Sequence, residues 1–307
     1  MRPSPLASAL LVFAGGACYG AMAPVIRVEY AAGFTWQQTT AGQATFGLLL
    51  FAALLAVQLA RGRRLAPVSA SGALKLVGTG MTTCCTCIFY SISLSYLPVA
   101  VAITLLFQFT WIGLVIQMLV TRTPPRATEL AAAALVVAGT LLASGLLSSE
   151  LEVDYHPVGV ACGLVSAVSC ALFMFFSGRV ETEMPPVQRG LIVCAGAALL
   201  ANAVCPTFIP GDTMAAIAPY GLVQGLFALF LPVILFGLGT PQLPCGISTI
   251  LASAELPCSI ILTFLVVGEG VDALQAAGVA TILAGVTVSQ LPALRPLLAR
   301  AQKARGR

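Results

Sequence analysis

The chain has 307 residues, of which 59% are hydrophobic and only 8% are charged. A soluble domain carries roughly 25% charged residues, and a mean hydropathy of +0.98 leaves too little polar surface for a water-soluble molecule of this size. Composition therefore excludes a soluble globular enzyme and indicates an integral membrane protein. Because a helix crosses the bilayer with about 20 residues, the chain has room for about ten crossings.

Uncharged apolar runs recur along the chain, separated by short polar segments. Each run is long enough to span a bilayer as a helix, and their alternation is too weak for a transmembrane β-barrel. The expected spanning helices cover 7–26, 37–59, 76–96, 99–120, 130–148, 157–178, 190–209, 217–238, 244–267 and 273–291. We therefore expect an all-α integral membrane protein with ten transmembrane helices.

The distribution of basic residues predicts the orientation, because Lys and Arg concentrate in cytoplasmic loops. With the N-terminus inside, every Lys and Arg except Arg27 falls on the inner side. Residues 292–307 then form a basic cytoplasmic tail, which we interpret as a topology signal rather than a lipid-binding element. The net charge of +4 gives no indication of nucleic acid as a partner. We predict a multi-pass protein of the cell (inner or plasma) membrane, with both termini cytoplasmic.

Segments of the first half recur in the second half in the same order. Since each half holds five expected helices, an odd number, the second half would enter the membrane from the opposite side. Two such inverted repeats can close one gate while opening another around a site at the membrane midplane, which favours transport over a receptor or structural role. The matching segments are Cys18-x3-Met22-x4-Arg27-Val28-Glu29 with Cys170-x3-Met174-x4-Arg179-Val180-Glu181, 152 positions apart, and Leu97-Pro98 with Leu243-Pro244 and Ala138-Gly139 with Ala284-Gly285, 146 positions apart.

A further set of short motifs lies at helix ends and in the later helices. They are Tyr19-Gly20, Leu94-Ser95-Tyr96-Leu97-Pro98, Ser253-Ala254-Glu255-Leu256-Pro257, Gly268-Glu269, Gly278 and Ala284-Gly285. On these residues the chain resembles the drug/metabolite transporter superfamily, and specifically proteins built from two EamA-type domains. The resemblance covers 7–148 and 157–291 as the first and second five-helix repeats. It departs from the family pattern at Arg122-Thr123, where Gly-Glu is common, and at Gln43, where arginine is common.

Members of that family mostly export small metabolites, amino acids or drugs. The resemblance therefore implies efflux of a small amino-acid-like or amphipathic compound.

Glu255 is the only acidic or basic side chain within the ten expected spans. A carboxylate at bilayer depth costs roughly 3 kcal/mol on insertion scales, so it must face protein or a water-filled cavity. There it could exchange protons or pair with a cationic group of a substrate. Pro257 lacks an N–H, so we expect the carbonyl of Ser253 to be free beside the carboxyl. The alternative is a neutral Glu255 that hydrogen-bonds a neighbouring helix as a structural element.

Two polar stripes supply further cavity candidates. Thr104, Gln108 and Trp111 share one face of their helix, and Gln108 lies within one residue of the repeat position of Glu255. Ordinary helix packing would explain this stripe almost as well. The second stripe comprises Thr79, Thr83, Thr86, Tyr90 and Ser93. It either lines an aqueous path or bonds to the carbonyls of its own helix.

Weaker candidates for the same cavity are Tyr19, Gln43 and Gln224.

Neither a metal site nor a disulfide is expected. Most of the ten cysteines lie in apolar runs, where a free thiol behaves as a small apolar side chain. Small-residue pairs (Gly16-x3-Gly20, Gly159-x3-Gly163 and Gly221-x3-Gly225) predict close helix packing. Pro24 and Pro232 should bend their helices.

A membrane-embedded enzyme would need clustered catalytic groups, whereas the expected spans offer one acid and the only histidine, His156, is peripheral. We therefore expect no enzyme and no cofactor. The predicted function is a secondary transporter for a small molecule, working by alternating access and possible proton coupling. An uncoupled facilitator or channel is the alternative.

Overall fold

The computed structural model describes residues 3–145, 156–205, 211–268 and 270–305, and within these ranges it is helical without a strand. Nine helices there are long and apolar enough to cross a membrane. The remaining expected span, 130–148, corresponds to a shorter apolar helix of 17 residues, Ala127–Ala143. The elements are α1 (Pro5–Gly20), α2 (Met22–Ala31), α3 (Trp36–Ala60), α4 (Ala70–Tyr96), α5 (Val99–Leu106), α6 (Phe109–Thr121), α7 (Ala127–Ala143), α8 (Pro157–Ser177), α9 (Pro186–Val204), α10 (Gly211–Gln224), the π-helix η2 (Gly225–Phe230), α11 (Leu231–Gly239), the 3₁₀ turn η3 (Thr240–Gln242), α12 (Cys245–Ala252), α13 (Glu255–Val267) and α14 (Ala273–Arg305). The chain is thus an all-α membrane protein.

Prolines interrupt two of the expected spans. Pro24 offers no N–H to the carbonyl of Gly20, which is where α1 ends before α2 begins. Pro232 likewise cannot pair with the carbonyl of Ala228, which lies in the π-helix η2. Both prolines therefore lie where the regular helical hydrogen bonding is interrupted.

Charged residues lie within more of the spans than expected. The first span runs on through α2 to Ala31 and includes Glu29, while Lys75 lies in α4 and Arg189 in α9. The expectation that Glu255 is the only acidic or basic side chain inside a span is therefore wrong. Contacts with other helices allow charged side chains at these positions. Buried Glu29 is hydrogen-bonded, and the guanidinium of Arg189 donates to two carbonyls at the end of α8.

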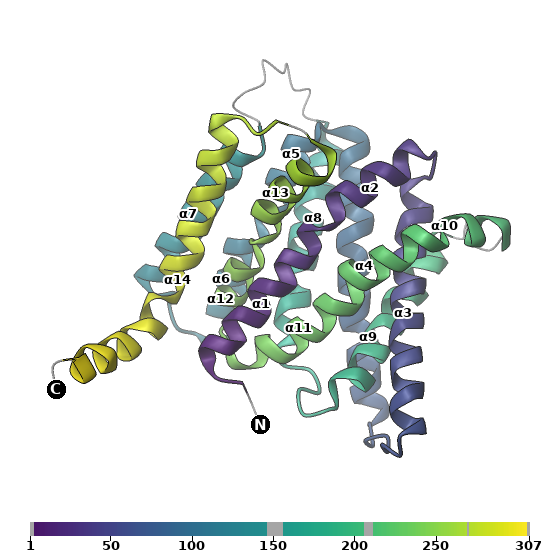
Figure 1. Ribbon diagram of the computed structural model, residues 1–307, viewed down its shortest axis with the longest axis horizontal. Coiled ribbons are helices and arrows are strands. Elements are labelled where there is room, and N and C mark those ends of the chain that lie inside the picture. Colours follow the sequence, from purple (N-terminus) through teal and green to yellow (C-terminus); the bar gives the residue numbers. More distant parts are fainter. Residues whose placement is uncertain (1–2, 146–155, 206–210, 269, 306–307) are drawn as a thin grey trace.

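The helices form one bundle, in which α14 lies alongside α7 at one edge and α3 packs with α9 and α10 at the other (Figure 1). The α3–α4, α6–α7 and α8–α9 connections lie at the same end as the start of α1, and the α2–α3 connection lies at the opposite end (Figure 1). Residues 292–305, expected as a tail, continue helix α14.

Glycine faces bring helices into backbone contact. A Cβ on Gly16 would lie 2.4 Å from the carbonyl oxygen of Ala252, and one on Gly20 would lie 2.4 Å from that of Glu255. Helix α1 is therefore pressed directly against the point where α12 gives way to α13. The Gly159–Gly163 pair packs closely on side chains of the α4–α5 segment, and the Gly221–Gly225 pair packs on α3. The expected packing role of all three pairs is confirmed.

Gly20→Ala should lower the free energy of unfolding by about 1–3 kcal/mol, because the new methyl group would meet backbone that cannot move aside. Gly78→Ala in α4 is the matched control, since a Cβ there would meet nothing within 4 Å; it should be neutral or stabilising by up to about 1 kcal/mol. Unfolding curves of both variants in one detergent measure the difference. Equal stability would contradict the close approach of α1.

Candidate functional site

A polar cluster lies where five helices meet in the middle of the bundle. We call it the central cluster, and its members are Tyr19 of α1, Gln43 of α3, Thr83, Cys87 and Tyr90 of α4, Cys170 of α8 and Glu255 of α13. The carboxyl of Glu255 interacts electrostatically with Tyr19, Tyr90 and both thiols. The structure thus gathers side chains that are up to 236 positions apart around one acid.

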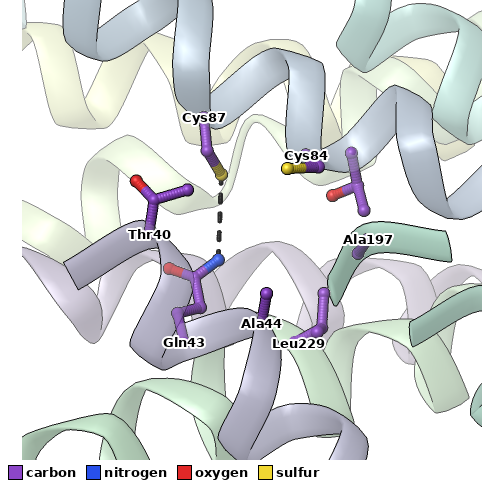
Figure 2. Close-up of a pocket in the computed structure, with 8 residues that line it drawn as sticks. Thr40, Gln43, Ala44, Cys84, Cys87, Ala197 and Leu229 are labelled. Carbon is purple, nitrogen blue, oxygen red and sulfur yellow. Dashed lines mark hydrogen bonds between the residues drawn. The ribbon is translucent and has the colours of Figure 1, made fainter. Parts of the chain in front are cut away.

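Hydrogen bonds tie parts of the cluster together. The Tyr19 hydroxyl interacts with that of Thr83. The amide nitrogen of Gln43 donates to the sulfur of Cys87 at 3.7 Å, and Figure 2 shows the two side chains pointing at one another across the gap between α3 and α4. These contacts link α1 to α4 and α3 to α4 within the central cluster.

Glu255 is the first residue of α13 and so stands at the N-terminal end of a helix. The N-terminal end of a helix carries a partial positive charge, which favours a negative group there. No basic side chain forms an ion pair with Glu255 within the described part of the chain. A carboxyl held this way is able to bind a proton or a cationic group.

The turn between α12 and α13 is closed by short-range hydrogen bonds. The carbonyl of Ser253 accepts from the N–H of Leu256 at 3.3 Å, and the N–H of Ala254 donates to the carbonyl of Leu251 at 3.2 Å. The expectation of a free Ser253 carbonyl is therefore wrong. Although Pro257 removes the i+4 donor, the chain tightens into an i+3 turn that supplies another one.

An equivalent turn separates α5 from α6, in the first half of the chain. There Gln108 donates to Leu105 at 3.2 Å and Thr110 donates to Phe107 at 3.2 Å. Three turn hydrogen bonds recur at a constant separation of 146 positions: Gln108–Leu105 with Ala254–Leu251, Thr110–Phe107 with Leu256–Ser253, and Ile112–Gln108 with Cys258–Ala254.

The flanking boundaries follow the same spacing. Pro98 and Pro244 are the N-caps of α5 and α12, and Arg122 and Gly268 end α6 and α13 in the left-handed conformation, with φ of 55° and 76°. Each of these pairs is also 146 positions apart. The two interrupted helices therefore share one local backbone design.

Helices α6 and α12 pack tightly on one another. The side-chain oxygen of Gln117 accepts from the N–H of Gly246 at 2.8 Å, and the hydroxyl of Thr249 donates to the carbonyl of Thr110 at 3.1 Å. A Cβ on Gly113 would lie 2.4 Å from the Thr249 hydroxyl oxygen. Helices α5 and α13, which occupy the corresponding positions in the two halves, form no comparable interface among the described residues.

A small cavity adjoins the central cluster between α3, α4, α9 and η2 (Figure 2). Its volume of about 10 Å³ is room for about one water molecule. Its lining residues are Thr40, Gln43, Ala44, Thr83, Cys84, Cys87, Ala197 and Leu229. In this conformation the space is therefore closed to a metabolite.

The stripe on α4 divides between the two roles expected for it. Thr79 and Thr86 donate to the carbonyls of Lys75 and Thr82 in their own helix. Ser93 donates instead to the carbonyl of Gly159 in α8. Of the other two members, Thr83 lines the small cavity and Tyr90 interacts electrostatically with Glu255.

The α5–α6 stripe forms a hydrogen-bonded chain of its own. Thr104 donates to the carbonyl of Ala100, Gln108 donates to the carbonyl of Thr104, and the indole of Trp111 donates to Gln108 at 2.7 Å. The three side chains share a face, as the spacing indicates. Trp111 is 44% exposed, and the described hydrogen bonds of this stripe stay within α5 and α6.

Sequence reasoning missed the thiols of the central cluster. All ten cysteines are free, and Cys87 and Cys170 had been interpreted only as small apolar side chains. The sequence does single out one of these thiols, because Cys170 belongs to the repeated Cys-x3-Met segment. Within the described residues, no group of His, Cys, Asp and Glu could hold a metal ion.

Comparison with known proteins gives a shared fold and no family. No family model matches the chain, and no curated protein matches it. Twenty-nine chains of solved structures match. One of them, described only as "Crystal structure of protein", is 18% identical with a TM-score of 0.77, over 95% of this chain and 100% of that chain. The whole described bundle is therefore a fold found in a solved structure.

Gln117→Leu should lower the free energy of unfolding by about 1–3 kcal/mol, because the N–H of Gly246 would lose its partner in a partly buried place. Gln37→Leu, at the start of α3, is the control, since that side chain carries no hydrogen bond within the described structure and should change little. Thermal unfolding of both variants in one detergent tests this. If Gln117→Leu left the free energy of unfolding unchanged, the hydrogen bond between Gln117 and Gly246 would not stabilise the contact of α6 with α12.

Proposed function

We propose that this chain is a secondary transporter that moves a small molecule across the membrane by alternating access. The observation that carries the proposal is the pair of matched helix interruptions, one of which holds Glu255 in the middle of the bundle. Interrupted helices in corresponding positions of two halves are characteristic of transporter binding sites, because they free helix ends for a substrate near the midplane. The proposed role requires no bond-making chemistry and hence no catalytic group.

The interruptions support two five-helix repeats, 7–148 and 157–291, of opposite orientation. A hydrogen-bond pattern that returns after 146 positions, with the same caps at both ends, is more than apolar composition produces. With an odd number of helices in each unit, the second repeat would run through the membrane in the opposite sense. Ten spans would result, with α7 as the shortest.

The unequal interfaces of the repeats support alternating access. In the two repeats α6 corresponds to α13 and α12 corresponds to α5, so the α6–α12 pair has its counterpart in the α13–α5 pair. Among the described residues only the α6–α12 pair is tightly packed. The α6–α7 connection marks the end of the bundle at which α6 closes on α12 (Figure 1). We infer that this conformation is closed at that end, and that the other state of the cycle would close α5 on α13 instead.

The resemblance to the drug/metabolite transporter superfamily, with two EamA-type domains, supports export as the direction. Around Glu255 the central cluster offers the hydroxyls of Tyr19 and Tyr90 and the amide of Gln43. This combination of one acid, polar groups and aromatic faces suits a small amino-acid-like or amphipathic compound with a cationic group. An uncoupled facilitator would use the same cluster without proton movement.

In the coupled form of the proposal, Glu255 releases a proton when the site faces one side and regains it when the site faces the other. Glu255→Gln should then abolish accumulation of substrate against a gradient in proteoliposomes, because an amide cannot carry the proton, while downhill exchange persists. Glu255→Asp retains a carboxyl and should retain part of the coupled activity. The assay is pH-gradient-driven transport of amino acids and small toxic analogues, with proton flux recorded in parallel. Unchanged proton flux in an active Glu255→Gln variant would eliminate coupling through this residue, and a native protein indifferent to the pH gradient would favour the facilitator.

The proposed orientation places both termini in the cytoplasm of a cell with the protein in its inner or plasma membrane. The basic connections and the start of α1 share one end of the bundle (Figure 1), which is the end that basic residues hold on the cytoplasmic side. Epitope tags at either terminus should be cleaved by protease only after the membrane is permeabilised. A tag cleaved in intact cells would reverse the assignment.

A further inference from the structure

A buried acid lies away from the central cluster, between α2 and α10. Glu29 is 0% exposed and Gln224 is 1% exposed, and the amide nitrogen of Gln224 donates to Oε2 of Glu29. The remaining oxygens, Oε1 of Glu29 and Oε1 of Gln224, are buried without a hydrogen-bond partner. An unpaired buried oxygen is destabilising, and both of these oxygens belong to side chains that are already in contact.

One missing donor would satisfy both oxygens at once. A neutral carboxyl carries an O–H group, which is the one hydrogen-bond donor that a glutamate can offer. With the proton on Oε1, Glu29 donates to Oε1 of Gln224 while the amide of Gln224 donates to Oε2. Acid and amide then form two parallel hydrogen bonds. We propose that Glu29 is a proton-binding site, and that the protonated Glu29–Gln224 pair fastens α2 to α10.

Among the described side chains, the helices around Glu29 offer no cation to hold it in ionised form. Helix α2 packs against α1, α3, α10 and α13. Helix α3 contains no titratable side chain, and the described titratable groups of the others are Cys18, Tyr19, Tyr220, Glu255 and Cys258. Tyr30, the next residue along α2, interacts electrostatically with Glu29.

Two charged residues of the helices that carry the pair, Arg27 of α2 and Asp212 of α10, have side chains outside the described part of the structure. Arg27 precedes Glu29 by two positions, a spacing at which residues on a helix do not face each other. Asp212 lies at the opposite end of α10 from Gln224.

A metal ion fits the pair less well than a proton does. Hard cations such as Ca²⁺ and Mg²⁺ take at least six oxygen ligands, whereas two oxygens are unpaired here and one carboxylate oxygen is already occupied by the amide. When the proton leaves to water, the carboxylate faces an amide oxygen with no counter-charge. The pair must then admit water or separate. Gln224 immediately precedes the π-helix η2. The i+5 hydrogen bonds of that segment break the regular helix, so α10 can move there relative to α11.

The structure supplies a matched control. Glu181, 152 positions after Glu29, occupies the corresponding place in the repeated Arg-Val-Glu segment but is exposed. Infrared difference spectra of the full chain in lipid nanodiscs, titrated with pH, count neutral carboxyl groups. In a Glu255→Gln background, Glu29→Gln should remove one neutral-acid equivalent from the spectrum in mildly acidic buffer, whereas Glu181→Gln should remove a carboxylate. If Glu29→Gln also removes only carboxylate signal, or if sodium ions abolish the neutral band, the proton site is overturned.

Hydrogen exchange of segments 22–31 and 214–224 tests the fastening role. Compared at the same pH, the native chain should exchange faster than Glu29→Gln in alkaline buffer and equally in mildly acidic buffer, because a glutamine keeps both hydrogen bonds at every pH. Equal exchange at all pH values would overturn the fastening. Neither measurement uses substrate, so a failure here is distinct from a failure of the proposed transport activity.

Discussion

The structure depends on one constraint: inside a membrane, every backbone N–H and carbonyl must be paired within the protein, because hydrocarbon offers no partner. A continuous helix meets this constraint alone, whereas an interrupted one does not. At Phe107–Gln108 and Ser253–Ala254 the chain turns out of helix and repairs itself with i+3 hydrogen bonds. At the start of α12 the repair comes from another helix, through the side chain of Gln117.

The glycine face of α1 follows from the same constraint. An interrupted helix presents backbone where a regular helix presents side chains, so its neighbour must come close to exclude lipid and fill the space. Gly16 and Gly20 allow this contact with the carbonyls of Ala252 and Glu255. The position of Glu255 is therefore fixed by backbone packing on one side and by the central cluster on the other.

Two acids inside the bundle show how surroundings and chemistry are linked. Glu255 gathers hydroxyls and thiols from three other helices, whereas Glu29 meets a single amide. Neither has a basic partner in the described structure, and an uncompensated charge in such a place is costly. A proton is the smallest species that relieves this cost, which is why both acids enter the proposals as proton carriers, one at the substrate site and one at the contact between α2 and α10.

The sequence by itself determined the membrane class, the near-complete set of spans and the likeness between the halves, because apolar run length and loop charge are local properties that no packing overrides. It also pointed to Glu255, Tyr19, Gln43 and Tyr90 by their polarity. Only the tertiary structure decided which polar residues meet: it joined Glu255 to Cys170, kept Thr104, Gln108 and Trp111 as a separate chain, and closed the Ser253 carbonyl with a local turn. It also drew Glu29 into the bundle, although the sequence placed that acid in a connecting segment. The reason is that a polar side chain in a membrane takes the partner that folding brings within reach, and that partner, as with Gln224, can be nearly two hundred positions away.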